Sequence, residues 1–315
     1  MTMTLQVRPR QTMTWAQFLS ETPERSIALD GVVSGGPAWD EKTLHVNFDH
    51  HDGVVREATM STAMQVLFAI KGGLMERMGT DYNVYVNDPD QDTSFAVWLL
   101  QHHKQFTGVQ SHPVINRLLS LNDRWDITGG AFPMSLDDSL VRQHCWVFSP
   151  YTDMRKSGEL ASAREGIRNC IMACGENLTA AFLGQAKEKM LDTRHEILYA
   201  SDRFKIVDEI GGNEARYHLF AHGMLDNGYI SLVARRPDGR FVYTIGRRSQ
   251  YVDFPVTKLY AALSAAERKF NILRSSEIKT SPWGGSDLIG GSNREFGSGL
   301  TWEQVRDIVK KELGV

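Results

Sequence analysis

The chain has 315 residues, a length that exceeds one ordinary hydrophobic core and suits two domains. Hydrophobic residues make up 42% and charged residues 23%, which is typical of a globular protein and excludes a disordered or fibrous one. The formal net charge of −3 gives no general electrostatic attraction to nucleic acid or anionic membranes, although the sum leaves a local basic groove open.

Cysteine content and hydropathy give two further expectations. Cys145, Cys170 and Cys174 do not suggest a disulfide framework, so we expect a reducing, cytoplasmic location. The N-terminal stretch lacks the apolar centre of a signal peptide, and no apolar run is long enough to span a bilayer. We therefore expect no membrane partner.

The first predicted strand of interest covers residues 26–29 and ends at Asp30-Gly31. A carboxylate directly after a strand is well placed for a ligand at the edge of a sheet. An ordinary turn aspartate is the alternative, because Asp is common before Gly in turns.

The next strand, residues 44–48, alternates apolar side chains and ends in Asp49-His50-His51. The triplet falls at the C-terminal end of the strand, where open α/β sheets bind their ligands. With 21 Asp and 10 His in the chain, chance alone predicts about 0.02 such triplets. The triplet is therefore the strongest indication of a functional site.

A helix is predicted over residues 63–78 and a third strand over 84–86, followed by the segment Asn-Asp-Pro-Asp-Gln-Asp. Its three carboxylates, Asp88, Asp90 and Asp92, repel one another unless a cation or a helix N-terminus offsets their charge. Capping of the helix predicted over 95–105 is one interpretation, and metal binding is the other. The glycine and the final glutamate of an EF-hand loop are missing.

Two further carboxylates, Asp123 and Asp126, end the helix predicted to run to residue 127. Either side chain could bind a ligand or simply pair with Arg124 on the surface. A long helical stretch is predicted from about 153 to 199, and it connects two domains.

The rest of the chain has the pattern of a smaller α+β domain. Strands are predicted at 204–207, 217–221, 229–234 and 240–245, with a hairpin turn at Pro237-Asp238-Gly239. The fold class is therefore α/β: an N-terminal mostly parallel sheet with flanking helices (1–150), a helical connector (151–200) and a C-terminal α+β domain (201–315).

The last predicted strand ends in Gly246-Arg247-Arg248-Ser249, and a glycine-rich stretch covers residues 283–299. Glycines let backbone N–H groups approach an anion, and Arg or Ser side chains can complete such a cradle. A flexible surface loop is the alternative. A capping box, Thr301 with Gln304, opens the helix predicted at 302–313.

Carboxylates combined with imidazoles suit Mn²⁺, Mg²⁺, Fe²⁺ or Zn²⁺ better than a redox copper site. Many carboxylates with few histidines favour two ions about 3.5–4 Å apart that share a bridging group. Hydrolysis of a phosphoester or phosphoanhydride is the matching reaction. A glycine cradle with arginines would hold the rest of the substrate.

These motifs resemble those of the DHH phosphoesterase superfamily. Asp49-His50-His51 resembles the triplet that gives the family its name, and residues 87–92 resemble its Pro-Asp-x-Asp metal motif. Asp30 and Asp123 resemble its two isolated aspartates, and the Arg-Arg-Ser and Gly-Gly segments resemble its substrate domain. The order of the motifs is permuted, Val86 or Asn87 stands where the family has a histidine, and Gly-Gly-Ser replaces Gly-Gly-Gly-His.

The resemblance implies roles for individual residues. His51 would face the scissile phosphate as general acid or electrostatic stabiliser, and Asp49 would orient the imidazoles or bind metal directly. The implied ligands of two Mn²⁺ or Mg²⁺ ions are Asp30, His50, Asp88, Asp90, Asp92 and Asp123. The implied substrate-binding residues are Arg247, Arg248, Gly290, Gly291, Ser292, Asn293 and Arg294.

The leading hypothesis is a metal-dependent phosphohydrolase, a phosphodiesterase or exonuclease-like enzyme. Its substrate would be a nucleotide, a cyclic dinucleotide or a short single-stranded oligonucleotide. A non-catalytic nucleotide sensor or scaffold that keeps the fold is the alternative, and a hydrolase of non-phosphate substrates such as amides is a third. The oligomeric state is left open, with a homodimer as one expectation.

Overall fold

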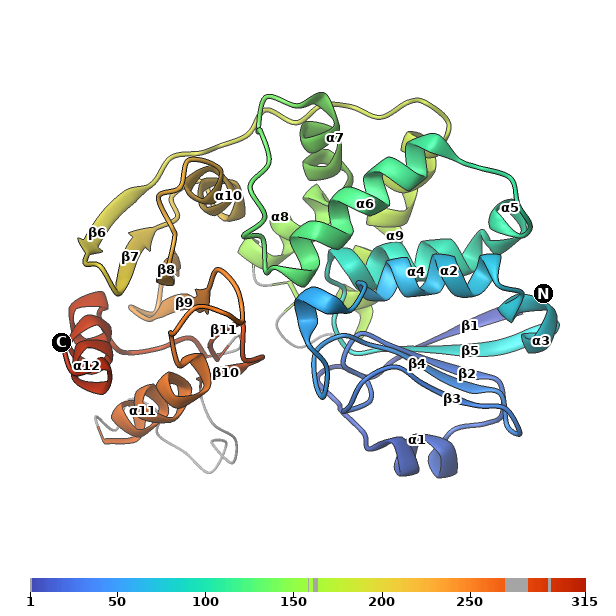
Figure 1. Cartoon of the computed structure of the whole chain (residues 1–315), viewed down its shortest axis with the longest axis horizontal. Coiled ribbons are helices and arrows are strands. Elements are labelled where there is room, and N and C mark those ends of the chain that lie inside the picture. Colours follow the sequence, from blue (N-terminus) through green and yellow to red (C-terminus); the bar gives the residue numbers. More distant parts are fainter. Residues whose placement is uncertain (1, 158, 161–163, 270–282, 294–295) are drawn as a thin grey trace. The chain divides into compact units, whose positions relative to one another are not determined.

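The computed structural model describes residues 2–157, 159–160, 164–269, 283–293 and 296–315. The chain divides into two compact units, Met1–Ile127 with Asp137–Met190, and Thr128–Leu136 with Leu191–Val315. The first unit is built on a sheet with flanking helices and the second on another sheet, which confirms the predicted α/β class (Figure 1).

The sheet of the first unit has the order β1-β5-β2-β4-β3. Its strands are β1 (Thr2–Val7), β2 (Ser26–Leu29), β3 (Ala38–Asp40), β4 (His45–Phe48) and β5 (Asp81–Val86). Only β3 runs antiparallel to its neighbour. Every residue of β2 and β4 is buried, as expected of central parallel strands that are covered on both faces.

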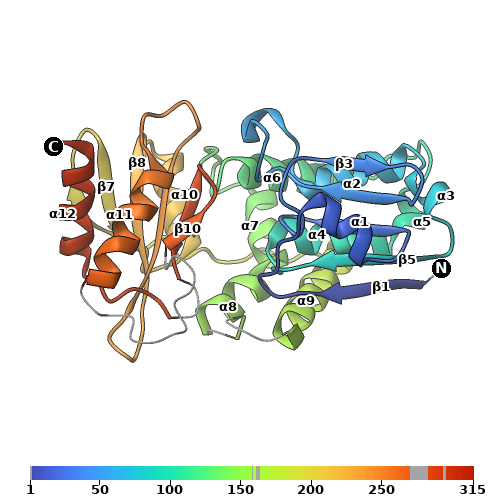
Figure 2. The same ribbon diagram turned by 90° about the horizontal axis from the view of Figure 1, so that it is seen from below.

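Helices cover both faces of this sheet. Helices α2 (Thr62–Lys71) and α4 (Gln91–Gln101) lie over one face and α1 (Trp15–Glu21) over the other (Figures 1 and 2). Ser61 caps α2 and Asp90 caps α4, so both helices begin close to the carboxyl ends of the strands. Residues 92–100 of α4 are all buried, because α2, α6 and α9 pack around it.

The other elements of the first unit are helical. They are η1 (Arg56–Ala58), α3 (Leu74–Met78), α5 (His103–Phe106), α6 (Pro113–Ile127), α7 (Ser139–Val147), α8 (Ser149–Ser157) and α9 (Arg164–Phe182). One hydrophobic core joins the sheet to α2, α4, α6 and α9. Helix α9 therefore belongs to the core of this unit.

The sheet of the second unit has the order β10-β11-β9-β8-β7-β6. Its strands are β6 (Glu196–Ala200), β7 (Phe204–Asp208), β8 (Gly228–Arg235), β9 (Phe241–Arg247), β10 (Trp283–Gly285) and β11 (Ile289–Ser292). All neighbours are antiparallel except β7 and β8. Helix α10 (Asn213–Ala221) covers one face, and α11 (Val256–Lys269) and α12 (Trp302–Leu313) cover the other (Figure 1).

Several sequence predictions differ from the structure. The helix predicted over 63–78 is divided into α2 and α3 at Gly72 and Gly73. The strand predicted at 217–221 is wrong, because these residues belong to α10. Strands β7 and β8 are parallel neighbours and need a crossover, which this helix supplies. Ala215 and Leu219 are buried on its inner face at helical spacing.

The helical connector predicted over 151–200 is also divided differently. Helices α8 and α9 lie within the first unit, residues 183–195 have no regular structure, and β6 belongs to the second sheet. Gly184 has a φ of 75° and ends α9 in the left-handed conformation that glycine adopts readily. Within the described ranges, no helix is both long and apolar enough to cross a membrane.

Candidate metal centre

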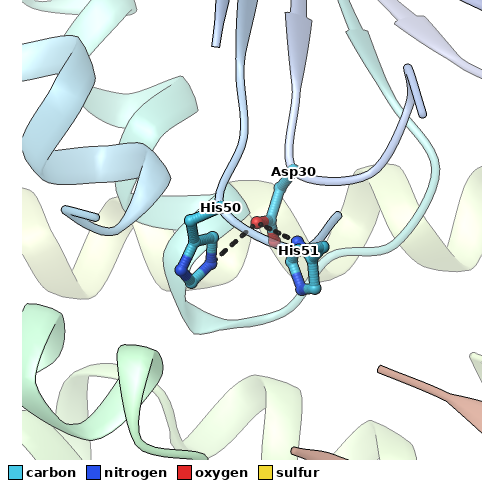
Figure 3. A group of neighbouring side chains, drawn as sticks. All are labelled: Asp30, His50 and His51. Carbon is cyan, nitrogen blue, oxygen red and sulfur yellow. Dashed lines mark ion pairs between the residues drawn. The ribbon is translucent and has the colours of Figure 1, made fainter. Parts of the chain in front are cut away.

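The candidate site lies at the carboxyl ends of three adjacent strands, β5, β2 and β4. Asp30 follows β2, Asp49-His50-His51 follows β4, and the segment 87–92 follows β5. Since these strands are parallel, their carboxyl ends meet at one edge of the sheet, where such folds bind ligands. Figure 3 shows Asp30 between the imidazoles of His50 and His51.

Asp30 is a buried carboxylate held by two hydroxyl groups. Thr62 and Thr93 each donate a hydrogen bond of 3.0 Å, one to each carboxylate oxygen. Its Oδ1 lies 3.5 Å from Nε2 of His50 and 3.4 Å from Nδ1 of His51. Burial raises the pKa of Asp30, but the two histidines outweigh this effect and lower it below its ordinary value. Asp30 is therefore ionised.

Asp49 uses its oxygens to shape the turn. Its Oδ1 accepts the backbone N–H groups of His50 and His51 at 2.6 and 2.9 Å, and Oδ2 accepts that of Gly31 at 3.1 Å. Nδ1 of His51 also lies 2.8 Å from Oδ1. A carboxylate with these donors orients its neighbours, so the geometry favours the orienting role over direct metal binding.

His50 is fully buried and faces three carboxylates. Its Nε2 lies 2.8 Å from Oδ2 of Asp126, 3.5 Å from Asp30 and 4.0 Å from Asp92. Burial and the nearby Arg56 guanidinium lower the pKa of His50, but the charges of Asp126 and Asp30 raise it to about 10. The three carboxylates thus strongly favour a positive charge beside them, which is either the protonated ring of His50 or a bound cation.

Asp92 is fully buried, and only one of its oxygens accepts hydrogen bonds within the described residues. Oδ1 accepts the Ala63 N–H at 3.1 Å and the Asn122 amide at 2.9 Å, while Oδ2 accepts none. The Asn122 oxygen in turn lies 3.1 Å from Nε2 of the buried His144. Burial and then the charges of Asp126 and Asp30 raise the pKa of Asp92 well above its ordinary value.

Asp90 is half-buried beside this cluster. It caps α4 through the Thr93 N–H at 2.8 Å, which is the capping that the sequence predicted as an alternative to metal binding. Burial, followed by repulsion from Asp30, Asp126 and Asp92, raises its pKa well above the ordinary value. Asp88 is half-buried in the same loop.

Asp123 and Asp126 lie one turn apart on α6, but their carboxylates contact different partners. Asp123 accepts the Ser61 N–H at 2.7 Å, where α2 begins. Asp126 contacts His50, and Arg56 lies 3.7 Å from the same carboxylate oxygen. The ligand set that the resemblance implies includes Asp123 and leaves out Asp126. The spacing of the two aspartates placed both on one helix face, but no sequence signal showed which one reached the triplet.

Two sets of three residues have ligand atoms within 4.8 Å of one another: Asp30, His50 and His51, and His50, Asp92 and Asp126. The residues fit a metal, because a fully buried carboxylate oxygen of Asp92 has no donor among the residues that the structure describes, and negative charge accumulates around it. Mostly oxygen ligands with imidazole suit Mn²⁺ or Mg²⁺. Both sets contain His50, which faces all three carboxylates through Nε2, and one imidazole nitrogen ligates one ion, so these distances support a single ion at His50.

The predicted anion cradle of the second unit is used largely for internal bonds. Arg247 donates to Asp287 and to the Val252 carbonyl, each at 3.1 Å. Ser292 accepts the Tyr243 N–H at 3.0 Å. Asn293 accepts a backbone N–H at 2.9 Å.

The glycines of this segment allow close packing. A side chain at Gly290 would come within 2.2 Å of the Tyr260 hydroxyl, and one at Gly291 within 2.0 Å of the Tyr243 carbonyl. Arg248 is exposed after β9, and Arg294 lies outside the described residues. The structure thus gives internal roles to most of the predicted cradle.

No family model, no curated protein and no solved structure matches this chain. Membership of the DHH phosphoesterase superfamily therefore stays a prediction. The triplet and the Asp-rich segment, far apart in the sequence, do meet at one sheet edge in spite of their permuted order.

Proposed function

We propose that the protein is a divalent-metal-dependent phosphohydrolase. One observation carries this proposal: the carboxylates of Asp30, Asp92 and Asp126 surround the buried imidazole of His50 at distances of 2.8–4.0 Å. A structural ion pair needs one carboxylate for one cation. Burial and the charges of Asp126 and Asp30 raise the pKa of Asp92, and this crowding destabilises the protein unless a cation binds.

Asp30, His50, Asp92 and Asp126 would hold Mn²⁺ or Mg²⁺, with Asp90 at the edge of the cluster. When bound, such ions polarise phosphoryl oxygens and lower the pKa of a coordinated water. Their preference for oxygen ligands and for phosphate substrates matches the residues at this sheet edge.

His51 supports the chemistry from the open side of the cluster. Asp49 accepts its Nδ1 proton at 2.8 Å, so the ring orientation is fixed and Nε2 can carry or release a proton. Its side chain is 32% exposed, in contrast to the fully buried His50. We assign His51 the role of donating a proton to the leaving oxygen of the phosphoester.

The substrate class is proposed from the resemblance and from charge. The resemblance implies a nucleotide, a cyclic dinucleotide or a short single-stranded oligonucleotide. A net charge of −3 favours these small substrates over long duplex nucleic acid. Of the two described arginines in the predicted cradle, we assign the contact with these phosphates to the exposed Arg248, because Arg247 is bonded to Asp287.

Turnover of a panel of phosphate esters, with Mn²⁺, with Mg²⁺ and with a chelator, tests the proposal. We expect hydrolysis that the chelator abolishes and added metal restores. Asp126→Asn should lower kcat by at least about 100-fold, since it removes a ligand, while the exposed Asp153→Asn serves as the matched control. Full activity of a folded Asp126→Asn protein would contradict the assignment.

A non-catalytic nucleotide sensor is the second candidate, and one contact favours it. Val86 or Asn87 stands at the position of the family's histidine, and Asn87 donates to the carbonyls of Gln11 and Gly31 at 3.1 and 2.9 Å. Its amide is thus engaged in joining two loops and supplies no imidazole. Metal binding and nucleotide binding without any turnover would identify the sensor.

A further inference from the structure

Three histidines of the second unit lie together, outside the candidate metal centre. His218 and His222 are one turn apart on α10 and at its C-terminal end, and His195 precedes β6. The ring centroids of His218 and His222 are 4.1 Å apart, and those of His195 and His218 are 5.7 Å apart. His222 is exposed, and the other two are partly exposed.

Backbone carbonyls fix the tautomers of two of these rings. Nδ1 of His222 lies 2.8 Å from the His218 carbonyl, and Nδ1 of His195 lies 2.9 Å from the Thr193 carbonyl. A carbonyl can only accept a hydrogen bond, so each Nδ1 carries the proton and each neutral ring presents its lone pair on Nε2. This arrangement is typical of histidines that bind metal through Nε2.

The crowding of the rings also favours the neutral, ligand-competent form of His218. Burial lowers the pKa of His218, and the proximity of His222 and His195 lowers it further. A transition metal that binds neutral imidazoles would replace this repulsion with coordination bonds.

We propose that His218 and His222 form a chelating pair for a transition-metal ion such as Zn²⁺, Ni²⁺ or Cu²⁺, bound through the two Nε2 atoms. Residues four apart lie on the same face of a helix, which is the spacing that two imidazole ligands of one ion require. His195 becomes the third ligand when its side chain turns toward the pair. The looser spacing of this trio distinguishes it from the two tighter sets at the sheet edge of the first unit.

The ligand chemistry separates this site from the carboxylate cluster. Imidazole alone selects borderline ions, whereas the oxygen-rich cluster suits Mn²⁺ and Mg²⁺. The two sites should therefore lose function independently. Variants of the histidine trio should leave metal-dependent hydrolysis unchanged. Variants of the carboxylate cluster should leave metal binding by the histidine trio unchanged.

The test is a Zn²⁺ titration of the untagged full-length protein by calorimetry. We expect His218→Asn and His222→Asn each to lose one equivalent of Zn²⁺ or to raise its Kd by at least about tenfold, and His195→Asn to weaken the same equivalent. His102→Asn is the matched control. His102 also ends a helix and bonds the carbonyl four residues earlier, but the residue at that position is Trp98, so that position offers no second imidazole to share a metal.

Unchanged Zn²⁺ stoichiometry and affinity in both His218→Asn and His222→Asn would overturn the proposal, as would an equal loss in His102→Asn. Circular dichroism of the metal-free variants shows whether they are folded. Cu²⁺ added in place of Zn²⁺ gives a second measurement, in which nitrogen hyperfine structure in the electron paramagnetic resonance spectrum should disappear with the pair. Its persistence in the His218→Asn/His222→Asn double variant would count against the site.

Discussion

Polar residues follow strand ends in both units, but their hydrogen bonds differ. After β2, β4 and β5, the carboxylates of Asp30 and Asp92 face an imidazole and one another, and one Asp92 oxygen accepts no hydrogen bond from the described residues. After β9 and β11, Arg247 and Ser292 are bonded within their own unit. The same sequence pattern therefore leaves a candidate ligand site only where like charges outnumber their partners.

Asp92→Asn should have the largest effect and separates activity from stability. An amide keeps the shape but removes a metal ligand, so we expect kcat to fall by at least about 100-fold. Because burial raises the pKa of Asp92, the metal-free variant should melt at a higher temperature than the metal-free wild type. Thermal melts with and without chelator test this. A variant that is both inactive and less stable would show that Asp92 is mainly structural.

Asn122→Leu should have the next largest effect, because Asn122 connects Asp92 to His144. Without its amide, Asp92 loses one of the two donors that fix its orientation. We expect metal affinity to fall by about 10- to 100-fold, with the protein still folded. Titration with Mn²⁺ measures this, and Asn116→Leu, an exposed change on the same helix, is the control. Equal affinities in the two variants would exclude a positioning role.

His144 should produce a pH dependence of stability. Burial lowers its pKa to about 3 in the folded state, whereas the unfolded value is about 6.5. Below pH 6.5, His144 takes up a proton in the unfolded chain but not in the folded chain. The free energy of unfolding therefore decreases as the pH is lowered from 6.5 to 3. The slope from this residue is about 1.4 kcal/mol per pH unit.

His144→Gln should flatten this dependence, because glutamine does not titrate and can still donate to Asn122. Urea unfolding of the first unit at several pH values measures the slope for wild type and variant. Half-buried His102→Asn is the control. Identical slopes for His144→Gln and wild type would show that His144 is protonated at no cost in the folded protein.

Arg247→Ala should have the smallest effect, which falls on stability and leaves turnover unchanged. Its bonds to Asp287 and to the Val252 carbonyl are partly exposed to solvent, so their loss should cost about 1 kcal/mol. Arg248→Ala, on the exposed neighbour, should change stability by less than about 0.5 kcal/mol. If Arg248→Ala raises KM, the contact with substrate phosphate is supported. A rise in KM for Arg247→Ala alone would reverse the comparison between the two units.

Strand and helix patterns in the sequence predicted much of the fold. The strands β2, β4 and β5 were recognisable from short apolar or alternating runs that end at Asp, Asn or Gly. Strand β1 was missed, although its side chains alternate, because its partner β5 begins 79 residues later at Asp81. Helix α10 was predicted as a strand because only the parallel pairing of β7 and β8 demands a crossover there.

For the site, the sequence was most informative where ligands follow strands directly. Asp30, His50 and Asp92 come together because parallel strands place their ends at one edge. The choice between Asp123 and Asp126 depended on how α6 packs, which residue spacing does not determine. Likewise, the spacing of His218 and His222 was visible in the sequence, but the approach of His195 depends on the tertiary structure.

The segment Thr128–Leu136 belongs to the second unit, although the first unit precedes and follows it along the chain. Ala131 is buried there among Val207 and Leu219, and Gly130 packs closely against Tyr217. A cut after residue 190 would therefore leave the C-terminal half without a piece of its own interior, because this segment would stay with the N-terminal half. The segment Thr128–Leu136 also starts two residues after Asp126, so a displacement of this segment is transmitted through the backbone to the last turn of α6. A force on one half of the molecule thus has a covalent route to the carboxylate that contacts His50.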